Sequence, residues 1–299
     1  MDYFKIGMIG LDTSHVVAFT KLLNDSANEH HVPGGKVVVA FPGGSDDMEL
    51  SFSRVDGFTD ELRDNYGVEI VDSPEEVAEK CDAIFLESVD GRKHLQQFKR
   101  IVSYKKPVFI DKPFTTSLKE AEEMLRLAKE FDTPLMSSSA VRYAVGLSSA
   151  LTKFEGKNII GMDCYGPLQI ETNHGLFWYG IHTAEMLYRA LGKGCEKVTV
   201  IKNEDHDIIL GEWKDGRIGT LRGNRKGNKY FGATIHGDDQ TEFVDASSGE
   251  KPFYAALLEE IIPFLKTGKP KIDIEETVEI TRFLEAANES RSTGKTVVL

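Results

Sequence analysis

The chain has 299 residues, of which 40% are hydrophobic and 28% are charged, a composition ordinary for a globular protein. Its length exceeds the usual size of one core, so we expect two domains, at 1–137 and 138–299. The formal net charge of −12 argues against a nucleic-acid partner, because phosphate backbones require clustered Lys and Arg. No apolar run approaches the roughly 20 residues of a membrane span, so no membrane partner is expected either.

Three cysteines, Cys81, Cys164 and Cys195, lie far apart and form no C-x-x-C pair. This spacing indicates reduced thiols and a cytoplasmic protein rather than a disulfide framework. The sequence does not begin with a basic stretch followed by an apolar run, so no signal peptide is expected.

Short apolar strands alternate with amphipathic helices through the first half. The expected strands are Lys5–Gly10, Lys36–Phe41, Glu69–Val71, Ala83–Ser88, Pro107–Ile110 and Pro134–Ser137. The expected helices are Ser14–Asn24, Thr59–Tyr66, Pro74–Lys80, Lys93–Tyr104 and Ser117–Phe131. Ser73 before Pro74 is the preferred order at a helix start. The alternation predicts βαβ units and a parallel sheet, which is a Rossmann-type α/β domain.

The pattern changes after about Phe131, where consecutive strands follow one another through short turns. The expected strands are Ile159–Tyr165, Lys197–Ile201, Asp207–Trp213, Ile218–Arg222, Gly232–Gly237, Glu242–Val244 and Thr296–Leu299. The expected helices are Val145–Phe154, Tyr179–Leu191, Tyr254–Lys266 and Ile274–Ser290. Asp215-Gly216 is a strong hairpin signal. We therefore expect an α+β second domain with a largely antiparallel sheet, and a C-terminal helix that could pack back on the first domain.

An open sheet face usually requires a cover, so we expect a homodimer or homotetramer formed through the second sheet. One basic cluster lies in a Gly- and Asn-rich stretch and comprises Arg222, Arg225, Lys226 and Lys229. Two interpretations of it stand: a solvated hairpin tip, or a contact with an anionic ligand or a partner subunit.

The first strand runs directly into the first helix, where a dinucleotide-binding fold places G-x-G-x-x-G. Only Gly10 remains of the three glycines, because Asp12 replaces the second and His15 the third. A carboxylate at position 12 opposes a bound diphosphate. The hydroxyls of Thr13 and Ser14 and the N–H groups of the helix end favour one. Either these residues only cap the helix or they contact a cofactor.

The second strand lacks the terminal acid that holds a ribose diol in such folds. The chain instead continues as Ala40-Phe-Pro-Gly-Gly-Ser45-Asp46-Asp47. Ser45 is a candidate cofactor contact and Asp46 a displaced candidate for the diol. The two glycines before them could form a turn and nothing more.

With these elements in order, three further motifs resemble the Gfo/Idh/MocA family, which includes glucose–fructose oxidoreductase and inositol dehydrogenase. The resemblance covers essentially the whole chain. The motifs are the strand, loop and helix start from Ala83 to His94, the tripeptide Asp111-Lys112-Pro113 in place of the family's E-K-P, and Gly180-Ile-His182-Thr-Ala-Glu185 in place of its G-x-H-x-x-D.

The resemblance implies an oxidoreductase that uses NAD or NADP to transfer a hydride to or from a sugar, cyclitol or related polyol. In the family, the Lys of E-K-P lies near nicotinamide and substrate, and the His moves the proton of the substrate hydroxyl. These roles carry over to Lys112 and His182. The resemblance also adds Ser88, His94 and Asp111 to the candidate cofactor contacts. A surface lysine and a packed histidine remain the alternatives for the two catalytic candidates.

The second domain departs from the family pattern at Trp178, which replaces the first Asp of D-x-G-x-H-x-x-D. Trp178 could stack on a sugar ring. His174 could supply the missing polar group, and Arg142 and Asp163 are further substrate candidates. No metal is expected, because no ligand set with convincing spacing is evident in the sequence.

Fold alone cannot settle the function, so two other interpretations stand beside the oxidoreductase. One is a degenerate relative that binds a small ligand or a partner without redox turnover, as Asp12 and Trp178 suggest. The other is a cofactor-assisted lyase or glycosidase, because the family includes enzymes that eliminate through transient oxidation.

Overall fold

A computed structural model describes residues 3–171 and 174–299 of the chain. These residues form two compact units, and each is described here by itself. The first contains the chain up to Thr115, Lys119–Ser138 and Tyr254–Ile274; the second contains Thr116–Leu118, Ser139–Phe253 and Glu275–Leu299. Residues 254–274, which the sequence analysis grouped with the second domain, therefore cluster with the first.

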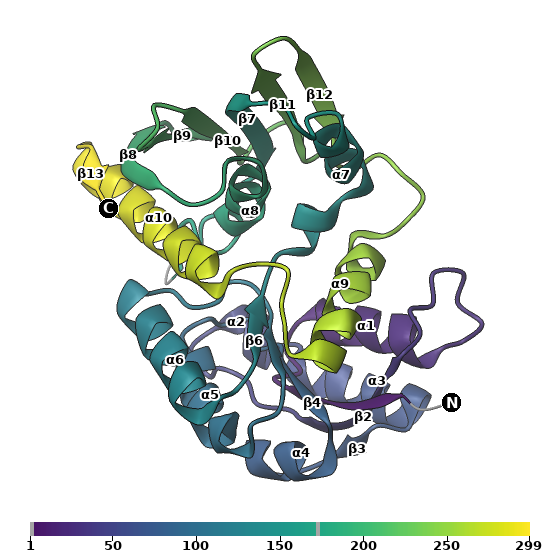
Figure 1. The fold of residues 1–299 in the computed structure, drawn as a ribbon. Helices are drawn as coiled ribbons and strands as arrows, with labels where there is room; N and C mark the ends of the chain where they lie inside the picture. Colours follow the sequence, from purple (N-terminus) through teal and green to yellow (C-terminus); the bar gives the residue numbers. More distant parts are fainter. Residues whose placement is uncertain (1–2, 172–173) are drawn as a thin grey trace. The chain divides into compact units, whose positions relative to one another are not determined.

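The first unit is built on a six-stranded sheet in the order β3-β2-β1-β4-β5-β6 (Figure 1). Its strands are β1 (Phe4–Ile9), β2 (Gly35–Phe41), β3 (Glu69–Ile70), β4 (Ala83–Leu86), β5 (Val108–Ile110) and β6 (Leu135–Ser137). All neighbouring strands are parallel, so the predicted Rossmann-type sheet is confirmed. The strand order reverses between β1 and β4. Sheets of this kind bind ligands at the carboxyl ends of the strands at this point.

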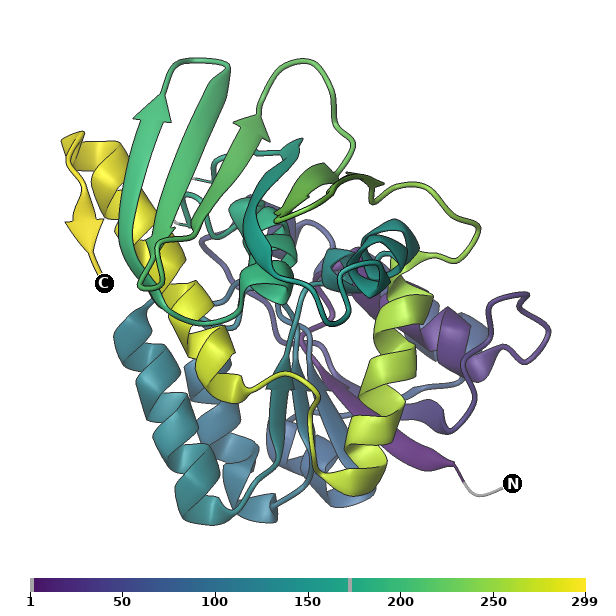
Figure 2. The same ribbon diagram turned by 45° about the horizontal axis from the view of Figure 1, so that its top comes forward.

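Helices cover both faces of this sheet. They are α1 (Ser14–Asn24), α2 (Glu49–Phe52), α3 (Val55–Tyr66), α4 (Pro74–Lys80), α5 (His94–Ile101), the 3-10 turn η1 (Val102–Tyr104) and α6 (Leu118–Phe131). Right-handed crossovers bring α1 and α3 to one face and α4, α5 and α6 to the other (Figures 1 and 2). Ser73 caps α4, because its hydroxyl accepts from the N–H of Glu76 at 3.2 Å.

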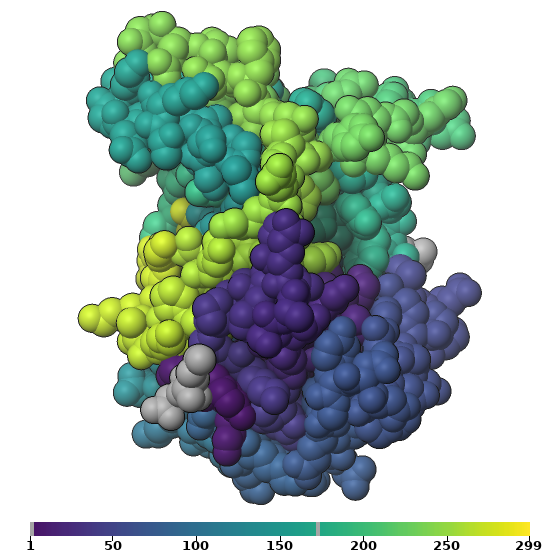
Figure 3. Space-filling view, turned by 90° about the vertical axis from the view of Figure 1, so that its right-hand side faces the viewer, coloured from purple at the N-terminus to yellow at the C-terminus, as the bar shows by residue number. Residues whose placement is uncertain are grey.

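Helix α9 (Phe253–Thr267) returns from the C-terminal half and packs on the first unit. The ring of Tyr254 lies 5.4 Å from that of Phe19 on α1. Gly35 of β2 has no side chain, and a Cβ there would lie 2.8 Å from Ile262 of α9. In the space-filling view, the yellow-green residues of α9 accordingly lie against the purple N-terminal residues (Figure 3).

Two details differ from the sequence expectation. The helix expected over Thr59–Tyr66 begins earlier, as α3, at Val55, because Gly57 interrupts its amphipathic pattern without ending it. The four-residue helix α2 was not expected at all. It has no side-chain cap at its start, so the sequence gives no start signal for it.

The second unit contains a seven-stranded sheet in the order β12-β11-β7-β10-β9-β8-β13. Its strands are β7 (Ile159–Pro167), β8 (Cys195–Lys202), β9 (His206–Trp213), β10 (Ile218–Asn224), β11 (Gly232–Gly237), β12 (Thr241–Asp245) and β13 (Val297–Val298). Only β7 and β10 pair in parallel, so the largely antiparallel sheet is confirmed. The hairpin at Asp215-Gly216 joins β9 to β10, with Gly216 at φ +89°.

One face of this sheet packs on helices, and the other does not. The helices of the unit are η2 (Ala140–Tyr143), α7 (Val145–Thr152), α8 (Gly180–Leu191) and α10 (Ile274–Thr293). Met162 and Cys164 of β7 form a core with Leu187 of α8 and Phe283 of α10. Across the described residues of both units, no helix is both long enough and apolar enough to cross a bilayer.

Candidate active site

The carboxyl ends of β1 and β4 approach each other very closely. Gly10, which follows β1, has φ +91°. A Cβ at this position would lie 2.7 Å from the Cα of Ser88, which follows β4. Only glycine tolerates both the backbone conformation and the contact. Gly10, the one glycine that remains of the phosphate-binding pattern, is therefore required by its backbone conformation and by the close approach of Ser88.

Helix α1 begins with a conventional cap. The hydroxyl of Thr13 accepts a hydrogen bond from the N–H of His15 at 3.4 Å. Ser14 is exposed, and the structure gives it no capping bond. The segment could cap the helix or contact a cofactor, and capping accounts for Thr13. The start of α1 nevertheless lies at the edge of the sheet where such folds bind phosphate.

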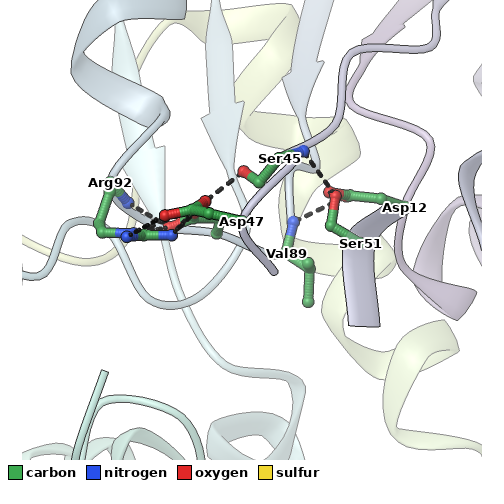
Figure 4. Close-up of polar contacts among 7 residues, drawn as sticks. Asp12, Ser45, Asp47, Ser51, Val89 and Arg92 are labelled. Carbon is green, nitrogen blue, oxygen red and sulfur yellow. Dashed lines mark hydrogen bonds and ion pairs between the residues drawn. The ribbon is translucent and has the colours of Figure 1, made fainter. Parts of the chain in front are cut away.

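Asp12 is fully buried between three loops (Figure 4). Its Oδ1 accepts from the N–H of Val89 at 2.8 Å, and its Oδ2 accepts from the hydroxyl of Ser51 at 2.6 Å. Burial raises the pKa of Asp12 even though these two hydrogen bonds lower it. The carboxylate thus joins the end of β1 to the loop after β4 and to α2.

The loop after β2 lies across the same corner. Ser45 donates its N–H to Ser51 Oγ at 2.7 Å and its hydroxyl to Asp90 Oδ2 at 2.8 Å (Figure 4). The N–H of Leu11, the residue after Gly10, donates to the carbonyl of Pro42 at 2.6 Å. The candidate cofactor contact Ser45 is therefore buried and bonded within the chain.

Arg92 contacts this loop through Asp47, and its guanidinium is held by two carboxylates. It lies 2.9 Å from Asp47 Oδ1 and 2.7 Å from Asp90 Oδ2. The pKa of Asp47 is lowered by its hydrogen bonds with Arg92. Asp46, the displaced candidate for a ribose diol, is exposed.

These contacts decide how the corner accommodates a dinucleotide. In a dinucleotide-binding fold, the diphosphate approaches the backbone at the second glycine position, which Asp12 occupies here. The Asp12 carboxylate already takes the N–H of Val89, and the loop after β2 covers Gly10. In this structure the corner does not fit a diphosphate, because Asp12 and the loop would first have to move apart.

A second buried cluster lies at the neighbouring strand ends. His15 Nδ1 is 2.6 Å from Asp111 Oδ2, and Glu87 is fully buried beside them. Burial raises the pKa of Asp111, but the charges of His15 and Lys112 outweigh it and leave the pKa lowered. Burial and the charge of Asp111 raise the pKa of Glu87 well above its usual value. Lys112 is 8% exposed, so the predicted cationic group is at this edge and largely removed from water.

His94 and Ser88 have contacts that explain them within the fold. The two ring nitrogens of His94 lie 3.0 Å from the carbonyl of Phe114 and 2.9 Å from that of Ser88. Ser88 Oγ accepts from Gln97 Nε2 at 2.7 Å. His94 is fully buried and joins the loop after β4 to the loop after β5.

In the second unit, α8 presents His182 beside a hydroxyl and two aromatic rings. Nδ1 of His182 lies 2.7 Å from Ser139 Oγ. The imidazole is 5.5 Å from the ring of Tyr179 and 5.5 Å from that of Phe231. The contact with the Ser139 hydroxyl orients the imidazole through Nδ1. His182 is half-buried, so part of the ring is accessible to solvent.

Trp178 and His174 extend the same aromatic cluster. The indole of Trp178 lies 6.1 Å from the ring of Tyr179 and 6.4 Å from that of His174. His174 is 2% exposed, whereas Trp178 is half-buried. The structure thus brings these two substrate candidates together with His182.

Arg142 and Asp163, the other two substrate candidates, are not in this cluster. Arg142 is buried and its guanidinium lies 2.9 Å from Glu185 and 2.6 Å from Glu276, which accounts for its charge within the fold. Asp163 is on the opposite face of β7 from the helix-packed residues, where it contacts His236 at 2.9 Å. Asp163 and the helix-packed residues therefore point to opposite sides of β7, because alternate residues of a strand do so, and its role as a substrate contact stays a prediction.

Two residues of the basic cluster, Arg222 and Lys226, lie at the open face of the sheet. Arg225 pairs with the buried Asp207 at 2.8 Å, and Lys226 lies 3.7 Å from Asp205. Arg222 and Lys226 line a groove of about 620 Å³ on this face together with Asp163.

Three residues of the site were missed by the sequence analysis: Glu87, Ser51 and Ser139. Glu87 carried a usable signal, because it is an acid directly after the wholly apolar strand β4. Ser51 and Ser139 carried none, since each acquires its role only through a partner that is distant in sequence.

Comparison with known proteins identifies the first unit. Residues 4–138 match the model of an oxidoreductase family with an NAD-binding Rossmann fold, Gfo/Idh/MocA. The resemblance stated from the sequence is confirmed for this part of the chain, and so is the cofactor class of its fold. A search of curated protein sequences finds no match.

Solved structures extend the likeness in fold to nearly the whole chain. Myo-inositol 2-dehydrogenase from Lactobacillus plantarum has 15% identity and a TM-score of 0.81, covering 100% of both chains. Myo-inositol dehydrogenase from Lactobacillus casei, in complex with NAD(H) and myo-inositol, has 15% identity and a TM-score of 0.78, covering 100% of this chain and 97% of that one. A probable dehydrogenase from Thermotoga maritima has 18% identity and a TM-score of 0.76, covering 98% of each. At such identities the likeness concerns the fold alone.

The buried Asp12 carboxylate generates the first prediction. Asp12→Gly restores the missing glycine and removes a negative charge, so we expect NAD(H) to bind at least about tenfold more tightly than to the unaltered protein. Charges about 4 Å apart near a protein surface repel by about 4 kcal/mol, and a tenfold change requires only about 1.4 kcal/mol. Titration calorimetry measures the change.

Asp25→Asn is the matched control, because Asp25 lies at the other end of the same helix. It should leave the affinity unchanged. Equal or weaker binding by Asp12→Gly, with the fold retained by circular dichroism, would show that the carboxylate does not oppose the nucleotide.

Proposed function

Because residues 4–138 form a Rossmann domain of the Gfo/Idh/MocA oxidoreductase family, we propose that this protein is an NAD(P)-dependent oxidoreductase of a cyclitol, sugar or related polyol. The observation that carries the proposal is Lys112, a largely buried lysine at the carboxyl end of a central strand. Lysine is rarely buried in a structural role. The nicotinamide cofactor would accept or supply the hydride.

Lys112 follows β5 and is flanked by two acidic groups. The pKa values of Glu87 and Asp111 both respond to its charge, so the ammonium group lies within electrostatic reach of both. A cation held in a site poor in water stabilises a developing alkoxide far more than it would in solution. We assign to Lys112 the stabilisation of the substrate oxygen as its proton leaves.

His182 is proposed as the group that takes this proton. A general base must be oriented, and the hydroxyl of Ser139 lies 2.7 Å from Nδ1 of His182. His182 would thus be the catalytic residue of the second unit, and Ser139 a positioning residue.

The aromatic cluster around His182 supports a ring-shaped polyol as substrate. The rings of Tyr179 and Phe231 lie 5.5 Å from the imidazole, and the indole of Trp178 lies beside the ring of Tyr179. The C–H face of a saturated six-membered ring packs on such surfaces, and its hydroxyls remain for polar groups. Structural relatives named as inositol dehydrogenases agree with this class of substrate.

One observation favours a second candidate function. The closed corner around Asp12 would suit a relative that has lost nucleotide binding and retains a small-molecule or partner site. The two candidates differ in one property, which is saturable binding of NAD(H) or NADP(H) by the folded protein.

We further propose a homo-oligomer in the cytoplasm. The three cysteines are free and buried, which supports a reducing location. Ile201, Ile218 and Phe243 are 72%, 50% and 83% exposed on the open face of the seven-stranded sheet. A second copy of this chain would remove these side chains from water.

The catalytic assignments predict large losses of turnover. Lys112→Ala and His182→Ala should each lower kcat by at least about 100-fold, since either loses a charge-stabilising or proton-transferring group. The assay follows NADH absorbance with a panel of inositols and sugars. Lys119→Ala and His236→Ala, which alter exposed residues of the same types, should retain activity. Near-normal turnover of either test variant would remove that residue from the mechanism, and a protein that binds neither nucleotide would favour the second candidate.

Ser139→Ala tests positioning separately from catalysis. The lost hydrogen bond is worth about 1 kcal/mol, so kcat should fall about fivefold while KM stays near its original value. The acidic limb of the pH–rate profile should also shift, because Nδ1 loses its partner. An unchanged profile with an equal loss of activity at every pH would indicate a structural role only.

The oligomer is tested by light scattering at micromolar concentrations. We expect a dimer or larger species, and Phe243→Asp should shift it toward the monomer because a charge replaces an apolar contact. Ile160→Asp is the control, since Ile160 is 51% exposed but alternates to the other side of β7. A monomeric wild-type protein would contradict the proposal.

A further inference from the structure

The buried cluster beside Lys112 has a composition that the oxidoreductase chemistry does not use. It consists of His15 in the first turn of α1, Glu87 after β4 and Asp111 after β5. One ligand atom from each of the three side chains lies within 4.8 Å of the other two. We refer to these three residues as the HED cluster. All three are buried, and their exposed fractions are 8%, 0% and 2% in the order given.

Glu87 is the unusual member. Both of its carboxylate oxygens are buried and have no hydrogen-bond partner among the described residues. A buried carboxyl group without partners costs several kcal/mol, and proteins compensate by pairing the group or by coordinating a metal ion with it. Glu87 is held in this position because its N–H bonds to the carbonyl of Ile9, so the side chain leaves the end of β4 directly into the cluster.

The charges of the cluster point in the same direction. Two carboxyl groups share a site that water barely reaches, and the charge of Lys112 acts on both of them. Asp111 receives the imidazole contact at 2.6 Å, whereas the two carboxyl oxygens of Glu87 have no hydrogen-bond partner in the described part of the chain. A divalent cation would satisfy both acids at once and use the neutral imidazole as its third ligand.

The distances are compatible with a metal after small side-chain movements. Zinc binds imidazole nitrogen and carboxylate oxygen at about 2.1 Å, so tetrahedral ligand atoms lie about 3.4 Å apart. Rotation of Glu87 must shorten separations of up to 4.8 Å, and the 2.6 Å contact between His15 and Asp111 must lengthen. The backbones of the three residues are fixed by α1, β4 and β5, so only the side chains have to move.

We propose that His15, Glu87 and Asp111 bind a divalent transition-metal ion. One imidazole and two carboxylates favour Zn²⁺, Mn²⁺ or Fe²⁺, whereas Mg²⁺ prefers oxygen ligands only. Three protein ligands leave one coordination position open, which is the arrangement of metals that act on a substrate or water. Sequence spacing could not reveal this set, because its members come from the start of one helix and the ends of two strands and meet only in the folded unit.

The experiment uses the full chain after dialysis against EDTA, without nucleotide. Titration with Zn²⁺ by calorimetry, and with Co²⁺ by visible absorption, measures stoichiometry and affinity. We expect one equivalent to bind. Glu87→Gln preserves the shape of the side chain and should weaken binding at least tenfold. His15→Gln should do the same, and it keeps the test decisive if Glu87→Gln fails to fold.

His236→Gln is the matched control, because His236 also contacts a carboxylate, Asp163, but does so on the exposed sheet face. It should bind like the unaltered protein. Absence of saturable binding, or binding that survives Glu87→Gln and His15→Gln, would overturn the proposal. Loss in His236→Gln alone would assign the ion to the surface pair and would overturn it equally. None of these outcomes depends on nucleotide binding or turnover.

Discussion

The buried carboxylate of Asp12 is the constraint on which the first unit's ligand edge depends. It accepts hydrogen bonds from the loop after β4 and from α2, and so ties three chain segments together at the point where β1 ends. A dinucleotide-binding fold normally keeps this point free for a diphosphate. Here the protein supplies an anion of its own, and its raised pKa reflects the cost of burying that anion. The corner is therefore stable without a ligand and closed to one in this conformation.

At the ends of β4 and β5 two more acidic groups are buried, and among the described residues Glu87 has no side-chain hydrogen bonds like those that stabilise Asp12. Glu87 and Asp111 follow strands whose residues are buried on both faces, so neither acid can reach bulk water. The charge of Lys112 acts on both acids, and the imidazole of His15 contacts Asp111 at 2.6 Å. A closed anionic corner therefore lies beside an unsatisfied acidic cluster at one edge of the sheet. Nucleotide binding at this edge therefore depends on Asp12, whereas the proposed metal binding depends on Glu87 and Asp111.

Hydrophobic periodicity was sufficient to predict the parallel sheet, most helices and the antiparallel second sheet, because each depends on a local pattern. Helix α2 escaped prediction since four residues without a cap leave no pattern. The candidates Gly10, Lys112 and His182 could be named from motifs. The sequence could not place Asp163, because it does not show which face of β7 opposes α8. Ser51 and Ser139 could not be found at all, since their roles exist only through tertiary contacts.

The dinucleotide and the Asp12 carboxylate compete for one position in this corner. A crystal structure of the unaltered protein with NAD at saturating concentration tests this directly. The account predicts the diphosphate at the start of α1, with Asp12 withdrawn from both Val89 and Ser51. A bound diphosphate with those two hydrogen bonds intact would contradict it.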